Sequence, residues 1–241
     1  KTNKKQMFKA NFVNKIENSR SSFENTGTRL EQELLGEVNT RKYKELAYAF
    51  LHQGEEDELE DKSQEEKFER MIKIREAAQK EFENALSLAD RDKYIDFKNS
   101  VDLVEKTQIG DPENPNRFFA KALLKQIKDR FTDKYTLKFF TATGGTHLDV
   151  CHGVDFFIKL YDKKSEVELA FATVDITKND KKDKARANVL ININQEESIK
   201  IDPSKNNEMF DKELFLNKIT DSTEKIVNAL IEDYKQRNHI K

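Results

Sequence analysis

Two apolar, β-prone runs separated by a short polar turn constrain this chain more than any other feature of its sequence. They cover residues 156–161 and 167–176, with Asp155 just before the first run and Asp175 near the end of the second. Side chains alternate between the two faces of a strand, so acids at the start of one strand and the end of its neighbour can converge. The sequence therefore predicts two strands that bring a pair of carboxylates together.

Paired carboxylates in this position favour a site for a hard divalent cation, Mg²⁺ or Mn²⁺. An aspartate is seldom placed beside a buried apolar run unless it is paired or bound to a ligand, which supports a metal site formed by Asp155 and Asp175. The alternative is that each acid only caps a strand or a turn. Both interpretations stay open on the sequence alone.

The segments around these two acids resemble a known family. One reads Gly-Val-Asp-Phe-Phe-Ile around Asp155 and the other Val-Asp-Ile-Thr-Lys around Asp175, and together they are similar to the motifs of the PD-(D/E)XK nuclease superfamily, which has the restriction-endonuclease-like fold. The resemblance implies that the two acids bind metal and that Lys178 assists the attacking water. The family's lysine closes an acidic-X-Lys triplet. Here Thr177 holds that place and Lys178 follows one residue later, on the opposite face of a regular strand.

Four further residues are candidates for the same site. Many members of the superfamily take an additional acid from a helix before the sheet, which by resemblance indicates Glu31 or Glu33 if the region from about 40 to 110 is an insertion. His147 and Asp149, just before the first strand, are candidates for the site or for the groove beside it.

A zinc site is the other metal hypothesis, because His147, Asp149, Cys151 and His152 are all ligand types. Zinc sites usually gather four ligands from separated pairs. These four lie within six residues on an expected loop or strand, where neighbours face opposite ways. The spacing therefore disfavours zinc.

A local basic stretch follows the second run and includes Lys181, Lys182, Lys184 and Arg186. Such a patch can hold a nucleic-acid backbone without reading its sequence. The alternative is an ordinary exposed loop.

The N-terminal half has the apolar spacing of helices. Apolar residues recur at steps of three and four over residues 7–16, 30–38, 43–50, 68–86 and 94–104. An acidic run over 55–61 reads as a solvated connection. Two of the three prolines fall in residues 111–116, which mark the main boundary. We predict a mainly helical region over 1–114, acting as an interaction module or partly as an insertion, and an α/β core over 115–241.

Within the core, the pattern predicts a helix, three strands, a linker, a fourth strand and a closing helix: 118–131, 135–139, 156–161, 167–176, 187–193 and 215–231. This order resembles the αβββαβ core of the nuclease superfamily, with the helix before the last strand reduced to residues 179–186. The predicted fold class is α/β (α+β): a restriction-endonuclease-like mixed sheet flanked by helices and preceded by a large helical region.

Net charge, hydropathy and cysteine content indicate which partners and which cellular compartment to expect. Lys+Arg total 43 against 45 for Asp+Glu, a formal net charge of −2, so a globally basic nucleic-acid binder is not indicated. No apolar run approaches the roughly 20 residues of a membrane span, no signal peptide is evident at Lys1, and a single Cys151 suits a reducing compartment. We expect a cytoplasmic protein with no membrane partner. The absence of an initial Met indicates a piece of a longer protein.

The function predicted from these features is metal-dependent endonucleolytic hydrolysis of DNA, with RNA as the other substrate class. Cutting both strands would favour a homodimer, and the helical region would bind a protein partner. The alternative is a nuclease-like domain without catalysis that serves as a protein or nucleic-acid interaction module. The displaced Lys178 favours the alternative, and the pair of acids favours the enzyme.

Overall fold

The computed structural model describes residues 27–51, 95–178, 186–203 and 208–239, together with Ser63, Glu66, Glu69, Arg70, Ile72 and Lys73. The expected helix over 7–16, the acidic run over 55–61, most of the expected helix over 68–86 and the linker 179–185 lie outside these residues. Among the described residues, no helix combines the length and apolar character that a membrane crossing requires.

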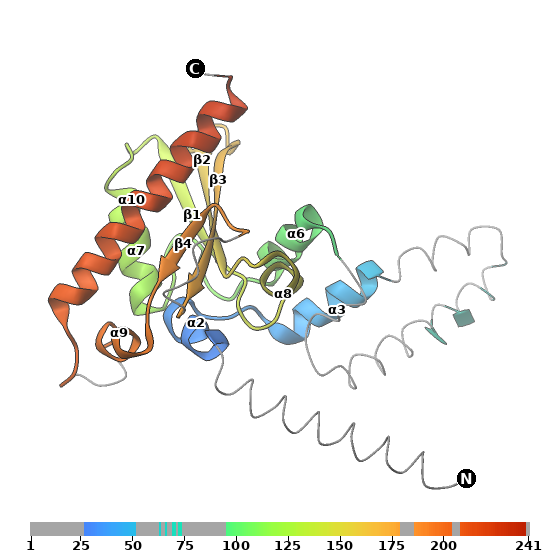
Figure 1. Cartoon of the computed structure of the whole chain (residues 1–241). Coiled ribbons are helices and arrows are strands. Elements are labelled where there is room, and N and C mark those ends of the chain that lie inside the picture. The colour runs from blue at the N-terminus through green and yellow to red at the C-terminus, as the bar shows by residue number, and fades with distance from the viewer. Residues whose placement is uncertain are drawn as a thin grey trace, which may run out of the picture.

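A four-stranded mixed sheet forms the centre of the protein (Figure 1). The strands lie in chain order, β1-β2-β3-β4; the first two pairs are antiparallel, and β3 and β4 are parallel. Their bounds are β1 Tyr135–Thr141, β2 Phe156–Asp162, β3 Glu168–Thr177 and β4 Val189–Asn192. The mixed α/β class and the four predicted strands are thus confirmed, with boundaries that differ by a few residues.

Helices cover both faces of this sheet. Figure 1 shows α7 and the long α10 on one face and α3, α6 and α8 on the other, with α2 near one end of the sheet. The helices are α2 Gly27–Leu35, α3 Thr40–Leu51, α6 Phe97–Thr107, α7 Phe118–Lys128, α8 His147–His152, α9 Gln195–Lys200 and α10 Lys212–Arg237. The sheet is therefore the middle of three layers, and each face is buried against apolar helix surfaces.

Strand alternation divides the buried residues into two cores. Along β3, Ala170, Ala172, Val174 and Ile176 face α7 and α10 and belong to the larger core, which Leu30 and Leu34 of α2 also enter. Phe140 and Phe157 face the other way and pack with Val38, Tyr43, Ile95, Val101, Val104 and Leu148. Both cores contain residues from either side of the proline-containing segment 111–116. The division at residue 114 stays a prediction.

Gly36 ends the first described helix earlier than the apolar spacing predicts. Its φ of +94° is a left-handed conformation that suits glycine, and its N–H donates to the Gln32 carbonyl at 2.9 Å. Val38, expected in the same helix, instead forms an isolated bridge with Gln108. The chain thus turns sharply between α2 and α3.

The segment 147–152 was expected to be a loop or strand, and that expectation is wrong: it is the helix α8. The Thr146 hydroxyl accepts the Asp149 N–H at 3.2 Å and caps the first turn. Gly153 ends the helix with φ +65°. Both capping residues are present in the sequence, but the segment between them has too few apolar residues to indicate a helix, which led to the expectation of a loop or strand.

β3 extends beyond the start of β4, and side chains satisfy the backbone there. The side-chain oxygen Oδ1 of Asn188 accepts the N–H of Thr173 at 3.2 Å, and an Asp233 carboxylate oxygen on α10 accepts the N–H of Phe171 at 2.8 Å. Two donors that β4 does not reach are therefore paired.

Candidate metal centre

Asp155 and Asp175 lie on the same face of neighbouring strands. Phe156 of β2 pairs with Val174 of β3 in antiparallel register, so one further step sets Asp155 opposite Asp175. Both lie on the sheet face that α8 covers. Phe157 is two residues after Asp155 and Phe171 is four residues before Asp175, so side-chain alternation puts them on the same face, and both phenylalanines pack in the smaller core with Leu148 of α8. Asp155 is 5% exposed and Asp175 is 6% exposed. The structure thus brings the two predicted acids to one buried place.

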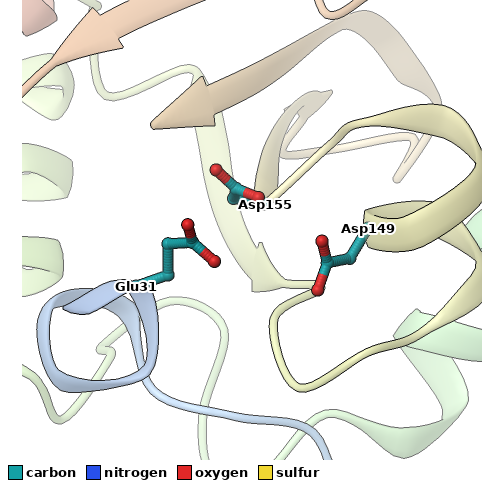
Figure 2. A group of neighbouring side chains, drawn as sticks. All are labelled: Glu31, Asp149 and Asp155. Atoms are coloured by element: carbon teal, nitrogen blue, oxygen red, sulfur yellow. The ribbon is translucent and has the colours of Figure 1, made fainter. Parts of the chain in front are cut away.

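Two further acids reach the same place from helices. Carboxylate oxygens of Glu31 from α2, Asp149 from α8 and Asp155 all lie within 4.8 Å of one another. Figure 2 shows the three side chains directed toward a common space between their elements. Glu31 and Asp149, both named as additional candidates from the sequence, are therefore members of this group, which we call the acidic cluster.

Backbone donors fix two of these carboxylates. The N–H of Ile176 donates to Oδ2 of Asp155 at 2.5 Å, so β3 orients the acid that immediately precedes β2. The N–H of Gly145 donates to Oδ2 of Asp149 at 3.1 Å, which ties the acid to the loop before its own helix. Backbone bonds of this kind hold a charged oxygen in place without adding a positive side chain.

The electrostatics of the cluster are those of crowded, buried acids. Burial raises the pKa of Asp149 to about 6, with a further contribution from Asp175, against the lowering effect of the Gly145 N–H. Burial, followed by the charges of Glu31 and Asp149, raises the pKa of Asp155 well above its usual range. Three or four carboxylates at this separation repel one another, and a cation among them removes that repulsion.

The donor set matches a hard divalent cation. Mg²⁺ and Mn²⁺ prefer carboxylate oxygens, and the 4.8 Å limit on the oxygen separations is compatible with ligand distances of about 2.0 to 2.6 Å around a single ion. The residues present therefore fit the metal that the family resemblance implies. Glu31, Asp149 and Asp155 would hold it, and Asp175 adds negative charge beside them.

The other predicted site residues lie around the cluster or outside the described chain. Glu33 is on α2 but is not part of the acidic cluster. Lys178 comes directly after the end of β3, and Thr177 has the strand parity of Asp175. Lys181, Lys182 and Lys184 lie outside the described residues.

Arg186, predicted to contact nucleic acid, contacts the C-terminal end of α8. Its Nη1 donates to the Cys151 carbonyl at 2.5 Å, and its stem lies beside Gly153. The side chain is exposed, and contact with nucleic acid stays a prediction.

The histidines of α8 make separate contacts. His147 is 1% exposed and its Nδ1 is 3.1 Å from the hydroxyl oxygen of Tyr43. His152 directs Nε2 toward the Ile95 carbonyl at 2.9 Å, and its ring lies edge-on to Phe97. Among the residues that the structure describes, neither histidine belongs to a ligand group of the kind that zinc requires.

Tyr43 is the residue near this site that the sequence did not single out. Its position on α3 fits the apolar spacing of that helix, so the sequence marks it only as a core residue. No local pattern shows that its hydroxyl meets a helix more than a hundred residues later.

Comparisons of this chain with protein-family models, with curated proteins and with solved structures find no match. The interpretation of the site therefore depends on its own residues and geometry.

Proposed function

We propose that this protein is a metal-dependent endonuclease that hydrolyses phosphodiester bonds of DNA, in the manner of the PD-(D/E)XK superfamily. The single observation that carries the proposal is the acidic cluster, in which oxygens from Glu31, Asp149 and Asp155 lie within 4.8 Å of one another. Asp155 immediately precedes β2 and Asp175 lies within β3, in keeping with what the resemblance implies for the two motif acids.

The arrangement of elements gives independent support. From α7 to β4 the chain forms a helix, three strands that pair antiparallel in chain order and a fourth strand parallel to the third, with the short helix α8 between β1 and β2. Apart from α8, this succession is in keeping with the αβββαβ order of that superfamily. The helix expected between β3 and β4 falls largely in residues 179–185, which the structure does not describe.

The residues of the cluster have distinct parts in this proposal. A divalent cation supplies charge neutralisation at the phosphate and lowers the pKa of a bound water. Glu31, Asp149 and Asp155 provide the oxygen ligands. The Ile176 and Gly145 N–H groups orient two of those ligands, and Asp175 increases the negative potential that attracts the cation.

A second function has its own supporting observation. Thr177, and not a lysine, has the strand parity of Asp175 at the place of the motif lysine. This absence favours a nuclease-like domain that binds metal or a partner without cutting. Arg186 and the neighbouring lysines would then contact nucleic acid, and the N-terminal helices a protein.

Cleavage assays separate the two functions. Supercoiled plasmid, linear duplex, single-stranded DNA and RNA would each be incubated with the chain and Mg²⁺ or Mn²⁺. We expect metal-dependent cutting that Asp155→Asn and Asp175→Asn abolish. Glu37→Gln, an exposed acid just after α2, is the matched control and should cut like the wild type.

Binding of Mn²⁺, followed by its electron paramagnetic resonance signal, completes the test. Binding without cleavage of any substrate would support the interaction module. Failure of the folded wild type to bind Mn²⁺ or Mg²⁺ would contradict both the enzyme and its metal site. Light scattering of the same samples measures whether cutting of both strands coincides with a dimer.

A further inference from the structure

The helix that carries Asp149 is too short to hold its own position. α8 has six residues, and isolated helices of fewer than about 12 residues are marginal in water. Its place must therefore come from contacts with the rest of the protein. Thr146 supplies one of them, since its hydroxyl donates to the Ala142 carbonyl at 2.6 Å while accepting the Asp149 N–H.

The hydroxyl of Tyr43 supplies a contact from a different part of the chain. It accepts the backbone N–H of His147, the first residue of α8, at 2.8 Å. The same oxygen is 3.1 Å from Nδ1 of the His147 ring, within hydrogen-bond distance. The first N–H groups of a helix have no partner inside it, so one phenol satisfies both a backbone group and a side-chain group at this helix end.

The surroundings leave this hydroxyl little freedom. Tyr43 is 0% exposed and its ring is 6.2 Å from the His147 ring, centroid to centroid. Burial, above all, raises the pKa of Tyr43, so the phenol keeps its proton at every pH at which the protein is studied. α3, through this side chain, thus holds the first turn of α8 in one place.

We propose that Tyr43 is a positioning residue for the acidic cluster: its hydroxyl fixes the first turn of α8 so that Asp149 faces Glu31 and Asp155. The inference depends on the metal site of the proposed function. Tyr43 acts through His147, two residues before Asp149, whereas Glu31 reaches the cluster from a different helix, α2. In this inference the effect of the hydroxyl on metal affinity operates through Asp149.

Removal of the hydroxyl tests this inference. Tyr43→Phe keeps the ring and deletes one oxygen, and we expect its dissociation constant for Mn²⁺ to rise about tenfold, the lower end of the effect of losing an outer partner of a metal ligand. Tyr161→Phe is the matched control. It deletes the same atom near the end of β2 opposite to Asp155, about 20 Å along the strand, and should bind Mn²⁺ like the wild type.

A double-mutant cycle separates positioning from a general loss of structure. In an Asp149→Asn background, Tyr43→Phe should change Mn²⁺ affinity by less than about twofold, whereas in a Glu31→Gln background it should keep its full effect. An equal loss in both backgrounds, or no loss in the wild type, would overturn the inference.

Two further measurements keep the outcome interpretable. If Tyr43→Phe does not fold, His147→Gln replaces it, because that change removes the contact of the ring with Tyr43 but keeps the backbone N–H. A loss of Mn²⁺ affinity that disappears in the Asp149→Asn background supports positioning. A loss that is the same in that background overturns it. A folded wild type without Mn²⁺ binding would overturn the proposed function and this inference together. Wild-type binding with unchanged Tyr43→Phe would overturn this inference alone.

Discussion

Glu31 and Glu33 differ in role because of their positions around one helix. Residues two apart on an α-helix are separated by about 200° around its axis, so the two side chains of α2 leave it in nearly opposite directions. The sequence predicted one or the other as a ligand, and only Glu31 belongs to the acidic cluster.

We expect Glu31→Gln to raise the Mn²⁺ dissociation constant at least tenfold, because loss of a ligand should weaken binding no less than loss of an outer partner, which weakens it about 10- to 100-fold. Glu33→Gln should stay within about twofold of the wild type. Titration of Mn²⁺ by calorimetry measures both. Equal losses for the two variants would contradict the assignment of Glu31.

The raised pKa of Asp149 has a consequence for stability in the absence of metal. Its value of about 6 in the folded protein exceeds the usual 3.8, so the folded state binds this proton more tightly than the unfolded state does. The contribution of this group to the unfolding free energy is then fully present below about pH 4, falls as the pH rises through about 6 and is lost above it.

Asp149→Asn removes that loss. We expect the metal-free variant to melt at a higher temperature than the wild type at pH 8. The corresponding gain in unfolding free energy should be at most about 3 kcal/mol, and it should shrink toward pH 4. Thermal unfolding followed by circular dichroism checks this. Asp221→Asn, an exposed acid on α10, is the control, and a difference independent of pH would contradict the prediction.

The two strand acids were predictable and the two helix acids were only candidates. Asp155 and Asp175 meet because of strand alternation and a hairpin, which are local properties of the sequence. Glu31 joins them only through the packing of α2 against the rest of the protein, across more than a hundred residues. The apolar spacing of α2 does place Glu31 on the inward side, because it lies among Leu30, Leu34 and Leu35, whereas Glu33 lies off that stripe. What the helix alone does not show is which site the inward glutamate faces.

At the scale of elements, α10 is attached to the sheet by a polar contact as well as by its apolar face. Asp233 accepts the Phe171 N–H beyond the start of β4 and pairs with Arg237 on its own helix. At Phe171, where no neighbouring strand among the described residues accepts the N–H of β3, the side chain of Asp233 on α10 accepts it instead.

Asp233→Ala should lower the unfolding free energy by about 1 kcal/mol, the lower end of the effect of leaving a buried N–H without its acceptor, because the Phe171 N–H is partly buried. Asp221→Ala makes the same change at an exposed position of the same helix and should have an effect within about 0.5 kcal/mol of zero. Denaturant unfolding compares the two. Similar losses of unfolding free energy in the two variants would show that the hydrogen bond to Phe171 does not stabilise the protein.

The elements that the sequence predicted well are the long ones. α7, α10 and the strands β1, β2 and β3 have many apolar residues at regular spacing, so the spacing identifies each one as a helix or a strand. α8 and α9 have six residues each, and their evidence is confined to caps: Thr146 with Gly153, and the capping box of Asn194 with Glu197. Too few apolar positions remain in such a helix to reveal its period.

At the scale of the whole molecule, the N-terminal helices are part of both cores. Leu30, Leu34 and Leu35 are nearly inaccessible in the larger core, and α3 and α6 supply much of the smaller one. The sequence placed a boundary at residues 111–116 because prolines are local signals, whereas the apolar contacts that cross this boundary are between distant segments.

A fragment over residues 115–241 should therefore have no cooperative unfolding transition, whereas the whole chain should have a single one. Each lost buried leucine corresponds to about 2–5 kcal/mol, and the three together with half of the smaller core exceed the roughly 5–15 kcal/mol stability of a typical domain. Calorimetry of the two proteins checks this. A cooperative transition in the fragment would establish the C-terminal part as an independent domain.

The order of the four acids along the chain also affects synthesis on the ribosome. Glu31 and the apolar face of α2 emerge long before α7, α8 and β2, the elements against which they pack or which complete the cluster. At about 5–20 residues per second the interval is on the order of ten seconds. During that time the leucines of α2 lack their native partners and the nascent chain has no metal-binding group of acids. Capture of Mn²⁺ by arrested chains of increasing length would thus report the chain length at which α2 first packs against the segments that carry Asp149 and Asp155.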